Sequence, residues 1–248
     1  MTTLLVIAKE PVPGRVKTRL TPYHSHDEAA LLARAALTDT LSAVLRTPAT
    51  RRVLVLDGAP GPWLPPGFEV VPQVAGGLDE RLAAAFGMCR GPAVLVGMDT
   101  PQLTPELLRP AVEPFAWREC SAWFGPAADG GFWALGLADP DPALLRGVPM
   151  SKPWTGRAQR DRLLAAGLAV RDLPVLRDVD TAADAREVAA LAPGTRFART
   201  LAALAATRRT ATGQARTGRA ATGLSGAEAA GAGPGRATAR SGSPSPAR

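Results

Sequence analysis

Short apolar runs alternate with amphipathic segments over the first 206 residues. Apolar runs predict buried strands over residues 3–8 and 93–97. Shorter segments rich in apolar residues predict further strands over 52–56, 68–71, 121–124, 132–137 and 169–173. Apolar side chains at helical spacing predict helices over 78–89, 104–112, 156–166, 182–191 and 196–206, and one more that carries Leu37, Leu41, Val44 and Leu45 after the capping box Ser25-x-x-Glu28.

Strands separated by helices are typical of parallel β-α units with right-handed crossovers. The turn Asp129-Gly130-Gly131 instead joins two strands directly, which predicts an antiparallel hairpin. The pattern therefore predicts an α/β fold with a mixed, mostly parallel sheet. Because no internal repeat and no linker precede residue 207, we expect one domain over 1–206 and a separate tail over 207–248.

Composition excludes several classes of protein. The chain has 248 residues, 46% of them hydrophobic, which is enough for a core that needs no disulfides. Its two cysteines stand in no Cys-x-x-Cys motif and in no Cys/His cluster, so a zinc site and a disulfide scaffold are both excluded. The longest apolar run near the N-terminus covers only residues 4–8, too short for a signal peptide or a membrane span. We therefore expect a cytoplasmic protein with no membrane span.

The net charge of +7 is concentrated in the tail. Residues 207–248 hold seven arginines and one glutamate, a net charge of +6, which leaves +1 for the body. The tail consists mostly of Ala, Gly, Thr, Ser, Pro and Arg, a composition that cannot bury enough apolar surface to fold, so we predict that it is disordered. Since the body is nearly neutral, no specific nucleic-acid partner is expected.

A basic loop follows the first predicted strand. Lys9, Arg15, Lys17 and Arg19 lie within eleven residues, together with Gly14 and two prolines that stiffen the backbone. Ligands of open α/β sheets bind beyond the carboxyl ends of the strands, and clustered cations there suit a polyphosphate. The loop contains neither a P-loop motif nor Gly-x-Gly-x-x-Gly.

Aspartates provide candidate metal ligands. Asp99 ends the strand over 93–97, where a carboxylate is well placed to hold Mg²⁺ or Mn²⁺ against substrate phosphates, although it could also cap the following turn. Asp178 and Asp180 share one face of an extended segment, and one of them could supply a second ligand. We favour Asp180 for this role, and Thr181-x-x-Asp184 predicts the start of the next helix.

Two further segments could border the same site. The turn Asp129-Gly130-Gly131 could face the acceptor substrate, and the polar and aromatic segment 150–156 could line the pocket beside it. Arg81, near the start of a helix, could reach a nucleotide or pair with an acid on its own helix. The only histidines, at positions 24 and 26, belong to no Ser/His/Asp arrangement, so a hydrolytic triad is not supported.

Four segments together resemble the DUF2064 family of glycosyltransferase-A-like proteins. They are Ala-Lys-x-Pro-x-Pro-Gly-x-Val-Lys-Thr-Arg-Leu at 8–20, Gly-x-Asp-Thr-Pro at 97–101, Gly-Pro-x-x-Asp-Gly-Gly-Phe at 125–132 and Asp-Val-Asp-Thr-x-x-Asp at 178–184. The resemblance implies a three-layer α/β/α, Rossmann-like nucleotide-diphospho-sugar transferase fold. It also implies that Lys9, Lys17 and Arg19 meet the nucleotide phosphates, that Arg81 contacts the nucleotide, and that Asp99 binds the metal.

A second resemblance keeps another reaction open. Residues 16–20 and 178–184 are similar to segments of the 2-phospholactate guanylyltransferases, which share this superfamily. Our leading hypothesis is a glycosyltransferase that passes the sugar of a nucleotide-diphospho-sugar to a small or lipid-linked acceptor. The alternatives are nucleotidyl transfer from an NTP to a phosphorylated small molecule, and a non-catalytic nucleotide-binding module.

The two enzymatic hypotheses use the same residues. Asp99 and Asp180 would hold Mg²⁺ or Mn²⁺ on the phosphates, while Lys17 and Arg19 would neutralise charge on the leaving group. No residue of the sequence is identified as a base for the acceptor, and we name Asp129 for this role by its place in the turn. The predicted site comprises catalytic residues (Asp99, Lys17, Asp129), nucleotide- and phosphate-binding residues (Lys9, Gly14, Lys17, Arg19, Arg81), acceptor-side residues (Asp129, Gly130, Gly131) and metal ligands (Asp99, Asp180).

Overall fold

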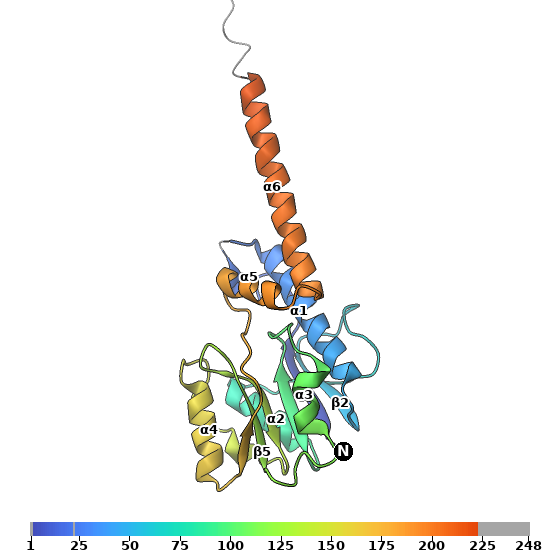
Figure 1. Cartoon of the computed structure of the whole chain (residues 1–248), viewed down its shortest axis with the longest axis vertical. Coiled ribbons are helices and arrows are strands. Elements are labelled where there is room, and N and C mark those ends of the chain that lie inside the picture. The colour runs from blue at the N-terminus through green and yellow to red at the C-terminus, as the bar shows by residue number, and fades with distance from the viewer. Residues whose placement is uncertain (1, 22, 223–248) are drawn as a thin grey trace, which may run out of the picture. The chain divides into compact units, whose positions relative to one another are not determined.

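The computed structural model describes residues 2–21 and 23–222 of the chain (Figure 1). Contacts divide it into two units, Met1–Ala205 and the chain from Ala206 onward. The first unit contains every predicted strand: β1 (Thr3–Lys9), β2 (Arg51–Asp57), β3 (Glu69–Pro72), β4 (Ala93–Gly97), β5 (Ala122–Pro126), β6 (Phe132–Leu137) and β7 (Val170–Asp172). Its helices are η1 (Thr18–Leu20), α1 (His26–Arg46), α2 (Leu78–Gly87), α3 (Pro105–Val112), η2 (Pro142–Leu144), α4 (Thr155–Ala165), α5 (Ala182–Leu191) and the first turns of α6 (Arg196–Thr222).

The strands form one sheet in the order β3-β2-β1-β4-β6-β5-β7. β1 is parallel to β2 and β4, and β2 is parallel to β3. β6 runs antiparallel to both β4 and β5, and β5 is parallel to β7. The sheet is therefore mixed and mostly parallel, as predicted, and the turn at Asp129–Gly131 closes the expected hairpin.

Two apolar clusters cover the two faces of the sheet. Leu4 and Val6 of β1 point to the face that packs against α1 and α3, whereas Leu5 between them points to the face that packs against α2 and α4. This alternation follows from the two-residue period of a strand. Because helices cover both faces, the fold has the three α/β/α layers that were expected.

A third cluster lies beside the sheet, where Leu20 and Val179 pack with residues of α1, α5 and the start of α6. In Figure 1, α5 lies next to α1. The sequence-predicted helix starts are confirmed: Ser25 and Glu28 form a capping box on α1, and Thr181 caps α5 together with Asp184.

The helix α6 continues to Thr222, past residue 207, where the sequence predicts the start of a disordered tail. No proline interrupts this stretch, so every residue in it can take a helical backbone. The rest of the predicted tail, residues 223–248, lies outside the described residues. In the part of the chain that is described, no helix combines the length and hydrophobicity needed to cross a membrane.

Candidate active site

A cleft of about 850 Å³ lies at the carboxyl ends of β1 and β4. A smaller hollow of about 270 Å³, lined by the basic loop, shares several of its residues. The predicted site residues that line the larger cleft are Lys9, Arg19, Arg81, Asp99, Asp129, Gly131 and Asp180. Lys17 lines the smaller hollow.

The basic loop is held by its apolar residues. Val16 and Leu20 are buried, Val16 in the core beside α1 and Leu20 against α1 and α5. Between these anchors, Lys17 has a left-handed backbone with φ 50° and precedes the short helix η1. This conformation is uncommon for a residue other than glycine. The local fold thus fixes the direction of the Lys17 side chain.

The ammonium of Lys17 bridges two predicted carboxylates. Its Nζ lies 2.9 Å from Asp99 Oδ1 and 3.4 Å from Asp180 Oδ1, and the side chain is only 7% exposed. Arg19 Nη1 reaches the other oxygen of Asp180 at 3.0 Å. Burial by itself lowers the pKa of Lys17, but Asp99 and Asp180 raise it, and the net shift is upward. Lys17 therefore remains a cation at neutral pH.

Two hydrogen bonds hold the segment before α5 against the end of β4. The Val179 N–H donates to the Asp99 carbonyl at 3.0 Å, and the Gln102 side-chain amide donates to the Arg177 carbonyl at 2.7 Å. Because Val179 is buried, its neighbours Asp178 and Asp180 both border the cleft. These contacts explain how carboxylates distant in sequence meet at one edge of the sheet.

Asp178 is the most electrostatically perturbed carboxylate of this group. Burial first, and then repulsion by Asp99 and Asp129, raises its pKa from 3.8 to about 7. Its Oδ1 is buried and accepts no hydrogen bond from the described residues. By contrast, Lys17 and Arg19 engage both oxygens of Asp180. Asp178 thus keeps an oxygen that is free to coordinate, whereas Asp180, which was favoured from the sequence, stays a prediction.

The hairpin turn packs tightly against the segment that leads into α4. The Asp129 carboxylate accepts a hydrogen bond from the Gly131 N–H at 2.8 Å, and the Gly156 N–H donates to the Gly130 carbonyl at 2.8 Å. Gly130 has φ +88°, and a Cβ there would lie 1.9 Å from the Pro153 carbonyl oxygen. The second glycine of Asp-Gly-Gly lines the cleft, while the first allows two backbones to approach closely.

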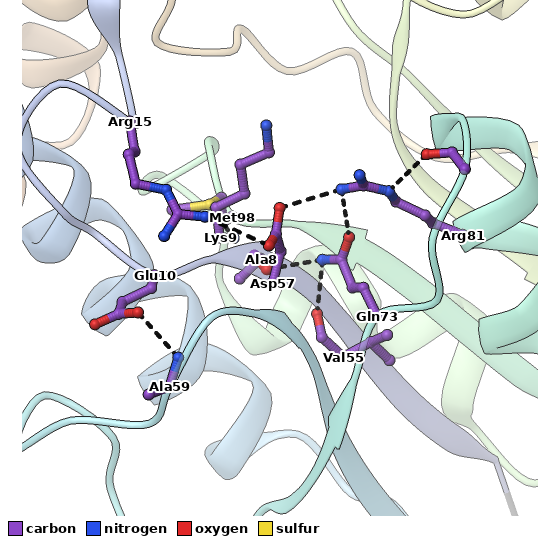
Figure 2. Close-up of polar contacts among 11 residues, drawn as sticks. Ala8, Lys9, Glu10, Arg15, Val55, Asp57, Ala59, Gln73, Arg81 and Met98 are labelled. Atoms are coloured by element: carbon purple, nitrogen blue, oxygen red, sulfur yellow. Dashed lines mark hydrogen bonds and ion pairs between the residues drawn. The ribbon is translucent and has the colours of Figure 1, made fainter.

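Arg81 takes part in a second polar network on the other side of β1 (Figure 2). Its Nη1 donates to Asp57 Oδ2 and to Gln73 Oε1, both at 3.2 Å, and its Nε donates to the Gly76 carbonyl at 3.0 Å. Arg81 therefore pairs with Asp57 of β2 and not with an acid on its own helix, which was the alternative left open by the sequence.

Gln73 is itself fixed by the sheet. Its amide nitrogen donates to the Ala8 carbonyl at 2.8 Å and to the Val55 carbonyl at 3.1 Å. Neither Gln73 nor Asp57 was predicted from the sequence as a site residue. Both could have been predicted from the principle that ligands of open α/β sheets bind beyond the carboxyl ends of the strands, because Asp57 ends β2 and Gln73 directly follows β3.

Comparison with known proteins supports a transferase. The chain is 32% identical over 193 residues to a phosphoenolpyruvate guanylyltransferase of Salinispora arenicola, covering 75% of this chain and 87% of the relative. It is 33% identical over 214 residues to a protein of the same name from Thermomonospora curvata, covering 83% and 91%. These matches confirm the expectation of an enzyme of the transferase class.

Comparison with solved structures supports the nucleotide-diphospho-sugar transferase fold expected from the sequence. A crystal structure from Desulfovibrio desulfuricans G20, of a protein provisionally named a nucleotide-diphospho-sugar transferase, superposes with a TM-score of 0.74 at 26% identity, covering 84% of this chain and 97% of that chain. The sequence profile of DUF2064, described as an uncharacterized protein conserved in bacteria, matches residues 31–152. The chain belongs to the DUF2064 family.

Most, but not all, predicted site residues of this DUF2064 protein meet at the cleft. Gly14 does not line it; its φ of +77° and the open space around it serve the turn of the loop. His24 is buried, with Nδ1 3.5 Å from Glu28 on α1, and it does not line the cleft. Among the described residues, no group of three or more His, Cys, Asp or Glu side chains could hold a metal ion unaided.

Proposed function

We propose that this DUF2064 protein is a divalent-metal-dependent nucleotidyltransferase that joins the nucleoside monophosphate of an NTP to a phosphorylated small acid. The position of Lys17, held between Asp99 and Asp180 at the cleft, carries the proposal. A fixed cation beside carboxylates is what phosphoryl-type transfer requires, because charge develops on phosphate oxygens in the transition state. The two relatives named phosphoenolpyruvate guanylyltransferase favour GTP and phosphoenolpyruvate as the first substrates to test.

The carboxylates at the cleft fit a magnesium or manganese ion. Mg²⁺ typically takes one or two protein carboxylates and completes its shell with water and substrate phosphates, so a cluster of three protein ligands is not needed. Asp99 and Asp178 would hold the ion, since Asp178 has a buried oxygen without a hydrogen bond and a pKa raised to about 7 by burial and its acidic neighbours. Asp180 is the other candidate. When bound, the ion would neutralise charge on the nucleotide phosphates.

The chain's own residues would position and stabilise the reacting groups. An oxygen of the acceptor phosphate attacks the α-phosphorus of the NTP, the new P–O bond forms, and the bond to the β-phosphate breaks with loss of pyrophosphate. Lys17 and Arg19 would offset the charge that accumulates on the leaving pyrophosphate. Because a phosphate acceptor is already an anion at neutral pH, the reaction requires no catalytic base. This accounts for a cleft without a histidine among its lining residues.

The acceptor would bind on the side of the cleft formed by the hairpin turn and the segment before α4. Asp129, Gly131 and Lys152 line this side. The ammonium of Lys152 suits the carboxylate or phosphate of a small acid. We therefore assign the Asp129–Gly131 turn to the acceptor.

Glycosyl transfer from a sugar nucleotide is the second candidate. The match to the provisionally named nucleotide-diphospho-sugar transferase favours it, and a carboxyl with a pKa of about 7, such as Asp178, would suit a base that deprotonates a hydroxyl acceptor. The scissile bond would then join sugar to phosphate, and the product would be a nucleoside diphosphate.

Product analysis separates these functions. The protein is incubated with Mg²⁺ or Mn²⁺ and either GTP plus phosphoenolpyruvate or 2-phospholactate, or a panel of sugar nucleotides. Pyrophosphate release that requires the acceptor and the metal supports nucleotidyl transfer. A nucleoside diphosphate formed from a sugar nucleotide supports the second candidate. Nucleotide binding without metal and without turnover of any donor would instead indicate a binding module.

A further inference from the structure

The guanidinium of Arg81 is fixed on one edge and open on the other. Nε and Nη1 are occupied by the Gly76 carbonyl, Asp57 and Gln73, all within 3.2 Å. Within the described part of the chain, Nη2 has no hydrogen-bond partner, and Arg81 lines the cleft. Figure 2 shows Asp57 and Gln73 beside the guanidinium of Arg81. Arg81 thus presents a nitrogen with two free N–H groups in a predetermined orientation.

The charge of Arg81 is already compensated. Asp57 Oδ2 lies 3.2 Å from its Nη1, while the other oxygen of Asp57 lies 3.7 Å from the more exposed Arg15. A cation that is already paired with a carboxylate adds little net attraction for a polyphosphate. A rigid donor whose charge is compensated can distinguish ligands by the positions of their hydrogen-bond acceptors.

The distance between the two polar networks fits a nucleotide. Asp57 ends β2 and Asp99 follows β4, and β1 separates these strands. Two strand spacings amount to about 10 Å, a separation that a ribose bridges between its base and its phosphates. Leu78, Leu82 and Leu95 line the cleft as well, and Leu78 is 43% exposed, so apolar surface is available for the face of a base.

We propose that Arg81 reads the base of the bound nucleotide and selects guanine, with Asp57 and Gln73 as positioning residues. The inference rests on the proposed function and adds the basis of its nucleotide choice. Guanine offers two acceptors, O6 and N7, on one edge, and arginine is a common partner for them. Adenine presents an amino group in place of O6, which would meet the N–H groups of Arg81 donor to donor.

Binding of base analogues to the full chain tests this assignment. Affinities for GTP, ITP, ATP and 2-aminopurine ribonucleoside triphosphate are measured by calorimetry with Mg²⁺ and without acceptor. ITP keeps O6 and N7, whereas the 2-aminopurine analogue lacks O6. We expect GTP and ITP to bind about tenfold or more tightly than the other two. The variant Arg81→Gln should bring all four affinities within about twofold of one another.

Inorganic tripolyphosphate serves as a probe that has no base. Arg81→Gln should leave its affinity unchanged, and Arg171→Gln, which removes an exposed arginine paired with Glu119, should alter neither affinity nor base preference. Asp57→Ala should reduce the ratio of GTP to ATP affinity, because Arg81 loses an orienting partner; a purely structural role would leave the ratio unchanged. Thermal melting of each variant establishes that it is folded.

The outcomes separate this inference from the proposed function. Equal binding of GTP and ATP by the native protein, base preference that survives Arg81→Gln, or weaker tripolyphosphate binding by that variant would each overturn the role of Arg81 alone. Absence of binding by every triphosphate would overturn the proposed function, and the inference with it.

Discussion

Lys17 Nζ lies 2.9 Å from Asp99 Oδ1, although one residue belongs to the loop after β1 and the other follows β4. The two strands are parallel neighbours, with Ile7 opposite Gly97, so their carboxyl ends open onto the same edge of the sheet. The pair places a buried cation against a carboxylate at the mouth of the cleft. This contact brings the basic loop, predicted to bind phosphates, next to an aspartate predicted to bind a metal ion.

Replacing Lys17 by methionine should strongly reduce the rate of catalysis while the protein remains folded. Methionine fills similar space but leaves developing phosphate charge without its cation, and loss of one such electrostatic contact costs roughly 10²–10³-fold in rate. We expect a decrease of that size in kcat/KM for pyrophosphate release. Arg171→Met, which removes an exposed cation remote from the cleft, is the matched control. Activity of Lys17→Met within threefold of the native protein would contradict the assigned role.

Replacing Asp99 by asparagine should remove the metal-dependent part of nucleotide binding. Asparagine keeps the shape but lacks the negative charge that a divalent ion requires. Saturation at a hundred times Kd stabilises a protein by about 2.7 kcal/mol, which for a domain of this size raises the melting temperature by about 5–10 °C. We expect native protein with GTP and Mn²⁺ to show such a shift, and Asp99→Asn to show none beyond that of GTP alone.

The control for this change is Asp172→Asn, which alters an exposed aspartate paired with Arg160 on the far edge of the sheet. It should retain the full shift with GTP and Mn²⁺. An undiminished metal-dependent shift in Asp99→Asn would assign the ion to other residues.

Much of the fold could be predicted because its signals are local. The central strands β1 and β4 are short apolar runs, and the helix starts at Ser25 and Thr181 carry their own capping partners within three residues. Because Asp99 and the basic loop with Lys17 both follow strands that are predicted to be parallel, the sequence also predicts that they lie at one edge of the sheet. The same local signals predicted the hairpin at Asp129.

The parts that sequence reasoning missed depend on long-range register. Asp178 and Asp180 share one face of an extended segment, so the sequence does not distinguish between them. In the structure, the hydrogen bond from Val179 to Asp99 holds this segment at the end of β4. Lys17 and Arg19 then contact both oxygens of Asp180, whereas Asp178 Oδ1 has no hydrogen bond. Similarly, Asp57 and Gln73 meet because Leu56 pairs with Pro72 across β2 and β3. No spacing within a single segment encodes either relationship.

Replacing Asp178 by asparagine should stabilise the metal-free protein above about pH 4. Burial, with Asp99 and Asp129 nearby, raises the pKa of Asp178 from 3.8 to about 7, so the folded state binds its proton more tightly than the unfolded state. Native stability contributed by this group is therefore present below pH 3.8 and is lost as pH rises to about 7. Asparagine does not ionise and avoids that loss. A difference of one in pKa corresponds to about 1.4 kcal/mol, so the gain reaches at most about 4 kcal/mol at neutral pH.

Denaturant unfolding at several pH values without metal measures this effect. The difference in unfolding free energy between Asp178→Asn and the native protein should grow from pH 4 to pH 7 and then level off. Asp161→Asn, at an exposed position on α4, should show no such trend. A difference that is constant across this range would contradict the raised pKa of Asp178.

Replacing Gly130 by alanine should disturb the acceptor side of the cleft, and Gly147→Ala separates its two causes. Both glycines have positive φ, +88° and +75°, so either alanine costs about 1–2 kcal/mol of backbone strain. Only at Gly130 does the new Cβ also meet a neighbour, the Pro153 carbonyl oxygen at 1.9 Å, whereas nothing lies within 4 Å at Gly147. Overpacking of this kind adds about 1–3 kcal/mol. We expect Gly130→Ala to unfold at a lower denaturant concentration than Gly147→Ala and to raise KM for the acceptor more than for GTP, because Asp129 and Gly131 move with the turn. Equal stability of the two variants would contradict the expected clash between the new Cβ at position 130 and the Pro153 carbonyl.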